Sequence, residues 1–254
     1  MKRKRILKIV IITFLLVLIG TVCSFFIYTN NYYRVNENDV YRYSSDKVMV
    51  ETDDSNNIWF RPKNSSNLKN EAFCFYPGGL VESDAYCPIM YKLALDGYIG
   101  CIANMPFKLA FFNANGADAI VNDESNLTND TKYSDLNWYI GGHSLGGVFA
   151  ARYYQKHSDT INGLVLMASY SDKDLSDTSG RVLSIYGSCD GVLEFDNYNK
   201  YKANLTNLTE YVIDGGNHSY FGDYGLQKGD NIGTITPLEQ WNIVTRKIEE
   251  FMSI

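Results

Sequence analysis

The sequence predicts an α/β fold with a mostly parallel sheet flanked by helices, preceded by one N-terminal transmembrane helix. Short apolar runs without polar alternation recur along the chain and are separated by segments of helical pattern. Such runs are typical of strands buried on both faces of a parallel sheet. An uncharged stretch at residues 9–28 precedes them, and about 20 apolar residues suffice to cross a bilayer as a helix.

Basic residues stand directly before the uncharged stretch: five Lys and Arg lie among the first eight residues. By the positive-inside rule we expect a single-pass protein of the cell membrane whose folded domain is extracellular. A cleaved signal peptide is disfavoured because the apolar run is long and bulky residues follow Ser24. Lipid attachment at Cys23 is disfavoured because Val22 before it is larger than such a site prefers.

Composition divides the chain into four parts. We expect a basic cytoplasmic segment at 1–8, the membrane anchor at 9–28, a stalk at 29–44 and the α/β domain at 45–254. Apolar runs within the domain predict strands at 47–51, 58–60, 71–79, 98–103, 137–142, 163–169, 181–187 and 209–215. Amphipathic patterns predict helices at 84–95, 107–120, 145–155 and 237–252.

Charge and cysteine usage exclude some classes of function. The net charge is −6, and it is −11 without the basic N-terminal residues, which argues against nucleic acid as a partner. No C-x-x-C pair is present, so neither a zinc site nor a thioredoxin-like redox site is expected. Cys74 and Cys101 lie in two apolar runs, and they form either a disulfide, permitted outside the cell, or two buried thiols.

The candidate nucleophile is Ser144, at the centre of the G-x-S-x-G motif Gly142–His143–Ser144–Leu145–Gly146. An apolar predicted strand precedes this motif and a predicted helix rich in small residues follows it. That context is typical of a nucleophile elbow, a sharp turn that exposes the serine hydroxyl. The N–H groups at the start of the following helix are aimed toward the same place.

Serine is a poor nucleophile without a base, and the chain contains three histidines. We expect the His143 side chain to point away from the site into packing. His157 follows the predicted helix and is expected at the surface or as a helix cap. His218 lies in a glycine-rich loop directly after the last predicted strand, where parallel sheets collect active-site groups, so it is the predicted base.

The base needs a carboxylate to orient it, and Asp190 is the predicted one. Asp190 follows the predicted strand 181–187 and lies between the serine and the histidine in the chain. Ser–Asp–His is the order expected for α/β-hydrolases. Glu194, Asp196 and Asp214 compete for this role.

An oxyanion hole needs two N–H donors. Leu145, directly after the serine, is expected to supply one from its backbone. The loop Tyr76–Val81 contains two glycines that permit close backbone approach, and we expect the second donor to be Leu80, with Gly79 as the alternative.

Five motifs taken together resemble a family of small, often membrane-anchored serine hydrolases: FYPGGLVE, MPFKLAFF, GGHSLGG, YGSCDGV and GGNHSYFGDYG. This group is similar to dienelactone hydrolases, and the resemblance covers roughly residues 45–254. It implies the α/β-hydrolase fold, a triad of Ser144, Asp190 and His218, and backbone donors at Leu80 and Leu145. Dienelactone hydrolases use a cysteine where this chain has Ser144, which favours ester hydrolysis over lactone opening.

The sequence therefore predicts a serine hydrolase that cleaves carboxylic esters through an acyl-enzyme, with no metal or organic cofactor. Its expected partners are a small-molecule or lipid-like ester substrate and the membrane, reached through the N-terminal helix. Residues 105–115 and 122–136 are the segments that could cover the site, and the first could line an acyl pocket. A transacylase or amidase with the same triad and a catalytically idle binding module are the alternatives.

Overall fold

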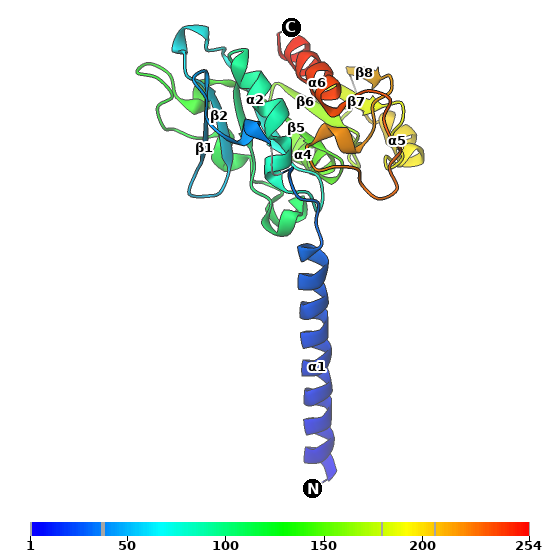
Figure 1. Cartoon of the computed structure of the whole chain (residues 1–254). Helices are drawn as coiled ribbons and strands as arrows, with labels where there is room; N and C mark the ends of the chain where they lie inside the picture. Colours follow the sequence, from blue (N-terminus) through cyan, green and yellow to red (C-terminus); the bar gives the residue numbers. More distant parts are fainter. Residues whose placement is uncertain (1, 37–38, 179, 206, 254) are drawn as a thin grey trace. The chain divides into compact units, whose positions relative to one another are not determined.

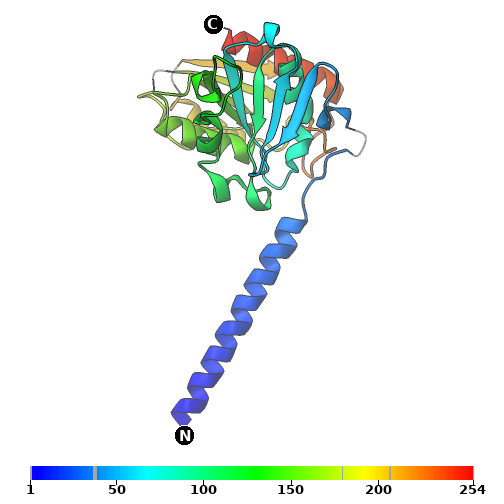
Figure 2. The same cartoon turned by 90° about the vertical axis from the view of Figure 1, so that its left-hand side faces the viewer.

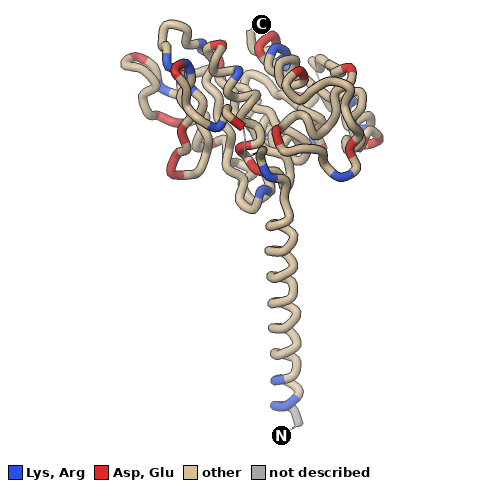
Figure 3. Tube along the Cα trace, viewed as in Figure 1, with Lys and Arg blue, Asp and Glu red and all other residues tan. Residues whose placement is uncertain are grey.

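A computed structural model describes residues 2–36, 39–178, 180–205 and 207–253. The chain forms two compact units, Met1–Tyr32 and Tyr33–Ile254. The first unit is the helix α1 (Lys2–Asn30), shown in Figure 1. Its charged residues are confined to the N-terminal turns (Figure 3). The segment 4–30 is long and apolar enough to cross a membrane, and an 18-residue stretch within it has a mean hydropathy of 2.8. An N-terminal signal would satisfy the same criterion, so the uncleaved anchor stays a prediction.

The second unit is built on an eight-stranded sheet with the order β1-β2-β4-β3-β5-β6-β7-β8 (Figures 1 and 2). Strands β3 to β8 pair in parallel, whereas β2 runs antiparallel to both β1 and β4. The mostly parallel sheet is therefore confirmed. The strands are β1 (Val48–Thr52), β2 (Ile58–Pro62), β3 (Glu71–Tyr76), β4 (Ile99–Ile102), β5 (Asn137–His143), β6 (Gly163–Met167), β7 (Arg181–Gly187) and β8 (Leu208–Ile213).

Helices cover both faces of the sheet, and each face has its own apolar core. α2 (Cys87–Leu95) and α6 (Pro237–Met252) pack in one core with Tyr139 of β5. α3 (Asp118–Val121) and α4 (Leu145–Lys156) pack in the other core with Ile140, the next residue of the same strand. Successive strand residues point to opposite faces, so burial on both faces explains why the strands read as unbroken apolar runs.

The predicted helix at 107–120 is wrong. The structure has two 3₁₀ turns there, Pro106–Lys108 and Ala110–Asn113, before the short α3. Phe107 and Lys108 have φ angles of 56° and 58°, in the left-handed region that a right-handed helix cannot contain. A further helix, α5 (Phe195–Lys202), was not predicted, because only Tyr198 of α5 is buried and no apolar stripe marks it.

All five cysteines are free thiols. Cys74 and Cys101 are register partners on the parallel neighbours β3 and β4, and both are completely buried. Burial raises the pKa of the Cys101 thiol well above its usual range, which keeps it protonated and unreactive. These two residues therefore act as small core side chains, the second of the two predicted alternatives.

Glu249 of α6 makes the stability of the fold depend on pH. Burial, with the hydrogen bond and charge of Asp96, raises the pKa of Glu249 from 4.5 to about 7. The folded state thus holds this proton more tightly than the unfolded state, and the stabilisation from it is lost as pH rises from about 4.5 to about 7.

We expect Glu249→Gln to raise the Tm of the full-length chain in detergent at pH 8 by roughly 2–4 °C, the effect of about 1 kcal/mol in a domain of this size. The gain should shrink at pH 5, where the wild-type side chain is protonated. The control is Glu250→Gln, which removes an exposed carboxylate that pairs with Lys247. An equal gain at both pH values would contradict the assignment.

Candidate active site

Ser144 lies on the turn between β5 and α4, with φ 51° and ψ −122°. A non-glycine residue at positive φ is strained, and such strain persists only where neighbours enforce it. The end of β6 and the residues after it supply that restraint. The Ser144 N–H donates to the carbonyl oxygen of Met167 at 3.0 Å, and its own carbonyl oxygen accepts from the Ser169 hydroxyl at 2.7 Å.

The two glycines of the motif are required by close backbone contacts. A Cβ on Gly146 would lie 2.1 Å from the carbonyl oxygen of Tyr76 and 2.3 Å from that of Pro77. A Cβ on Gly142 would lie 2.5 Å from the backbone carbon of Gly146. The first turn of α4 therefore packs directly on the end of β3, which places Ser144 beside the loop that follows β3.

His218 and Asp190 come together from the loops after β8 and β7. The Nδ1 atom of His218 lies 3.0 Å from Oδ2 of Asp190, and both side chains are at most 1% exposed. A carboxylate only accepts hydrogen bonds, so Nδ1 carries the proton and Nε2 is left with a lone pair. Nε2 has no hydrogen-bond partner among the residues that the structure describes.

The other oxygen of Asp190 is also held. Its Oδ1 accepts the backbone N–H groups of Val192 at 2.9 Å and Leu193 at 2.7 Å. These bonds compensate the loss of hydration of a buried carboxylate. They also orient Oδ2 toward His218. The predicted competitors do not reach His218: Glu194 and Asp196 are exposed near the start of α5, and Asp214 accepts from Ser188 at 3.5 Å.

Ser144 and His218 line the same pocket, which has a volume of about 260 Å³. Asp190 lies behind His218, and Leu145 contributes to the wall. The segments 105–115 and 122–136 do not line it. The remaining lining residues come from α4 and from the loops after β6 and β7: Val148, Ala168, Ser169, Tyr170, Val192, Leu193 and Glu194.

The two backbone N–H groups that were expected to form the oxyanion hole differ in whether they already make a hydrogen bond. Leu145 is the first residue of α4, and its N–H makes no hydrogen bond within the described parts of the chain. Leu80, the predicted second donor, has φ 56° and donates its N–H to the carbonyl oxygen of Lys108 at 2.8 Å. Leu80 is thus occupied in this conformation. Gly79 lies against Leu145, since a Cβ there would meet Leu145 Cδ2 at 2.9 Å.

The other two histidines lie in different surroundings: His157 at the end of α4, and His143 in the buried interior. His157 caps the C-terminus of α4, and its ring stacks on Tyr153 with centroids 4.2 Å apart. His143 is completely buried, as expected of a residue in packing. Its ring, however, lies against His218, with centroids 4.5 Å apart. His143 thus lies in packing and does not line the pocket, as expected, but that packing includes the ring of the predicted base.

The structure also identifies Asp230, which the sequence interpretation missed. Its carboxylate accepts the Gly191 N–H at 3.0 Å and the Ser219 N–H and hydroxyl at 2.8 and 2.6 Å. One side chain thereby connects the loop of Asp190 with the loop of His218. No local pattern marks Asp230, because its partners lie up to 39 residues away in the chain.

Gln240 of α6 fixes the same loop from the other side. Its amide oxygen accepts the Asn217 N–H at 3.0 Å, and its amide nitrogen donates to the Asn217 carbonyl oxygen at 2.9 Å. Gln240 is completely buried, so this paired contact holds the backbone directly before His218 without competition from water. The sequence did not indicate this contact, because Gln240 lies within the amphipathic pattern that predicted α6.

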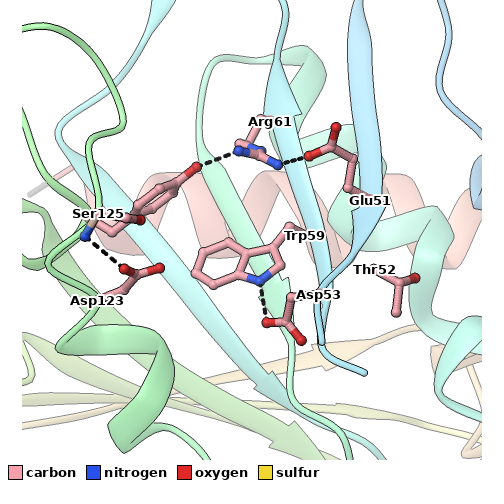
Figure 4. Close-up of a pocket in the computed structure, with 8 residues that line it drawn as sticks. Glu51, Thr52, Asp53, Trp59, Arg61, Asp123 and Ser125 are labelled. Carbon is pink, nitrogen blue, oxygen red and sulfur yellow. Dashed lines mark hydrogen bonds and ion pairs between the residues drawn. The ribbon is translucent and has the colours of Figure 1, made fainter. Parts of the chain in front are cut away.

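A second pocket of about 200 Å³ lies beside β1 and β2 (Figure 4). Several of its polar groups pair with one another. Arg61 donates to Tyr133 and pairs with Glu51, and the indole N–H of Trp59 donates to Asp53 at 2.9 Å. None of the predicted site residues lines this pocket. The pocket of Ser144 is therefore the candidate active site.

The fold and this site define a protein of the α/β-hydrolase class. The sequence matches the alpha/beta hydrolase family over residues 72–242, and the chain belongs to that family. A search of curated proteins gives no match.

Solved structures with the same fold include a predicted CIB-like hydrolase from Thermoplasma acidophilum. Its TM-score is 0.55 at 14% identity, covering 80% of this chain and 98% of that one. Est1E from Butyrivibrio proteoclasticus gives a TM-score of 0.56 at 14% identity, covering 82% and 98%. The structure of Est1E with ferulic acid bound gives 0.58 at 13% identity, covering 83% and 98%.

Asp230→Asn tests the connection between the two loops. The amide presents an NH₂ group where a carboxylate oxygen accepted, so at least one N–H group of the two loops loses its acceptor, at a cost of about 1–3 kcal/mol. We expect the Tm to fall by roughly 2–10 °C. The exposed Asp196→Asn is the matched control, and an equal Tm for the two variants would rule out the connecting role.

Proposed function

We propose that this protein is a serine hydrolase that cleaves carboxylic esters through an acyl-enzyme on Ser144. One observation carries the proposal. Ser144, on a strained turn, shares a pocket with His218, whose ring is oriented by the buried Asp190. This is the combination of nucleophile, base and orienting carboxylate that acyl transfer by serine requires.

The reaction begins when the Nε2 lone pair of His218 takes the Ser144 proton as Oγ attacks the ester carbonyl carbon. The carbonyl oxygen becomes an oxyanion, and Asp190 stabilises the imidazolium. His218 then gives the proton to the departing alkoxide, which leaves as an alcohol. Water attacks the acyl-enzyme by the same steps, with His218 first accepting a water proton and then returning it to Ser144.

Backbone N–H groups stabilise the oxyanion in this scheme. Leu145 supplies one from the start of α4. We assign the second to Gly79, which lies against Leu145 and has no N–H acceptor within the described residues. Leu80 could serve only after its hydrogen bond to Lys108 opens.

The proposed substrates are esters with short or medium acyl groups, because the pocket is small and mostly apolar. The N-terminal helix would hold the domain at the outer face of the cell membrane, near lipid or cell-envelope esters. A transacylase or amidase would use the same residues and differ in the acceptor of the acyl group.

The first test is ester hydrolysis by the full-length chain in detergent. We expect nitrophenyl acetate turnover and labelling of Ser144 by a fluorophosphonate, with Ser144→Ala and His218→Ala each reducing kcat by about 10³-fold or more. His157→Ala is the matched control, since His157 lies outside the pocket. Absence of both turnover and labelling in the wild type would refute the proposal and favour an idle binding module.

The second test varies the acyl group. A pocket of about 260 Å³ should accept acyl chains of about two to six carbons and disfavour those beyond about ten. We expect kcat/KM to fall about tenfold or more across that range. A feruloyl ester belongs in the panel, because a structure of similar fold was solved with ferulic acid bound. A rising kcat/KM with chain length would contradict the small pocket.

A further inference from the structure

Tyr86 is a completely buried tyrosine that the proposed reaction does not use. It ends the 3₁₀ turn Ser83–Tyr86 before α2, and its hydroxyl lies between two parts of the candidate site. The hydroxyl oxygen accepts the Gly78 N–H at 3.0 Å and lies 2.9 Å from Nδ1 of His143. One phenol therefore joins the loop after β3 to the residue preceding Ser144.

The direction of these hydrogen bonds can be assigned. The Gly78 N–H can only donate, so the Tyr86 oxygen accepts from it. Burial raises the pKa of Tyr86, so the phenol keeps its proton and donates it to His143 Nδ1. Nδ1 is then the unprotonated nitrogen, and His143 is a neutral imidazole with its proton on Nε2.

His143 in turn contacts the base. Its ring centroid is 4.5 Å from that of His218, 5.4 Å from that of Phe221 and 5.7 Å from that of Tyr86. Burial, and then the proximity of a charged His218, lower the pKa of His143 well below its usual range, outweighing an opposing backbone contact with His218. A neutral His143 does not oppose the imidazolium that forms on His218 during acyl transfer.

The polar atoms of His143 match the groups around it. Its Nδ1 accepts the Tyr86 hydroxyl proton, and its ring also makes a polar contact with the backbone of His218. A phenylalanine would fill similar space between Tyr86, His218 and Phe221 but would leave the buried Tyr86 hydroxyl without an acceptor. The histidine therefore links Tyr86 with the loop of His218.

We propose that Tyr86 and His143 are positioning residues: Tyr86 holds the Gly78–Gly79 loop against His143, and the neutral His143 ring holds that of His218. This inference rests on the proposed ester hydrolysis. It connects the oxyanion side of the site with the base side through two side chains. Gly78 is part of the arrangement, because a Cβ there would lie 2.6 Å from the Tyr86 oxygen and 2.8 Å from His143 Nδ1.

The kinetic test compares Tyr86→Phe, His143→Phe and the double variant in the full-length chain in detergent. We expect each single variant to lower kcat on nitrophenyl acetate about tenfold with KM within about twofold, because the contacts act in the transition state. The double variant should lose no more than the worse single one, because the two residues act as one unit. Active sites are counted by fluorophosphonate labelling, so unfolded protein does not lower the measured kcat.

Tyr98→Phe is the matched control. Tyr98 is also buried, and its hydroxyl lies 3.1 Å from that of Ser253, away from the pocket. We expect its kcat to equal that of the wild type even if its Tm falls. The positioning role would be overturned if Tyr86→Phe and His143→Phe kept the wild-type kcat per labelled site. It would also be overturned if the fold-losses in kcat of the two single variants multiplied in the double variant.

A second measurement needs no substrate. The ¹⁵N chemical shifts of the three histidines should show His143 as the Nε2-protonated tautomer in the wild type and a changed tautomer population in Tyr86→Phe. Wild-type protein with this tautomer but no ester turnover would overturn the proposed function and leave the Tyr86–His143 contact standing. An active wild type whose His143 is Nδ1-protonated would overturn the inference and leave the proposed function standing.

Discussion

The candidate site depends on the parallel pairing of β3 with β5. Tyr76 and Gly142, at the ends of these strands, are register partners. The loop after β3 and the turn of Ser144 therefore leave the sheet side by side, and Gly146 packs on the carbonyl oxygens of Tyr76 and Pro77. The order of strands diverges at β3, with β4 on one side and β5 on the other, and ligands bind beyond the carboxyl ends of strands at such a point.

The loops that carry Asp190 and His218 are placed in the same way by the parallel strands β7 and β8. Side chains contribute more to holding these two loops in position. Parallel pairing brings the loops of Asp190 and His218 to one edge of the sheet, and Asp230 and Gln240 then hold the backbone of those loops. Buried polar groups are costly unless hydrogen-bonded. Both oxygens of Asp190 accept hydrogen bonds, whereas His218 Nε2 has no hydrogen-bond partner among the described residues and is left to take a proton from the serine.

The sequence by itself determined the features that depend on short stretches of neighbouring residues. Unbroken apolar runs predicted the parallel sheet because each strand is buried on both faces. The spacing of Gly142, Ser144 and Gly146 predicted a sharp strand-to-helix turn, because close backbone contacts there exclude side chains. Position after a predicted strand was enough to select His218, since residues that follow parallel strands share one edge of the sheet. It left Asp190 with three competing carboxylates, and the structure decided for Asp190.

Only the tertiary structure decided the contacts between distant segments. The Leu80 N–H is occupied by Lys108, 28 positions later in the sequence, because Phe107 and Lys108 turn back at positive φ where a helix was expected. Tyr86 and His143 are 57 residues apart, and Asp230 and Gly191 are 39 apart. No periodicity encodes such pairs, because each forms only when the completed sheet brings two loops within hydrogen-bonding distance.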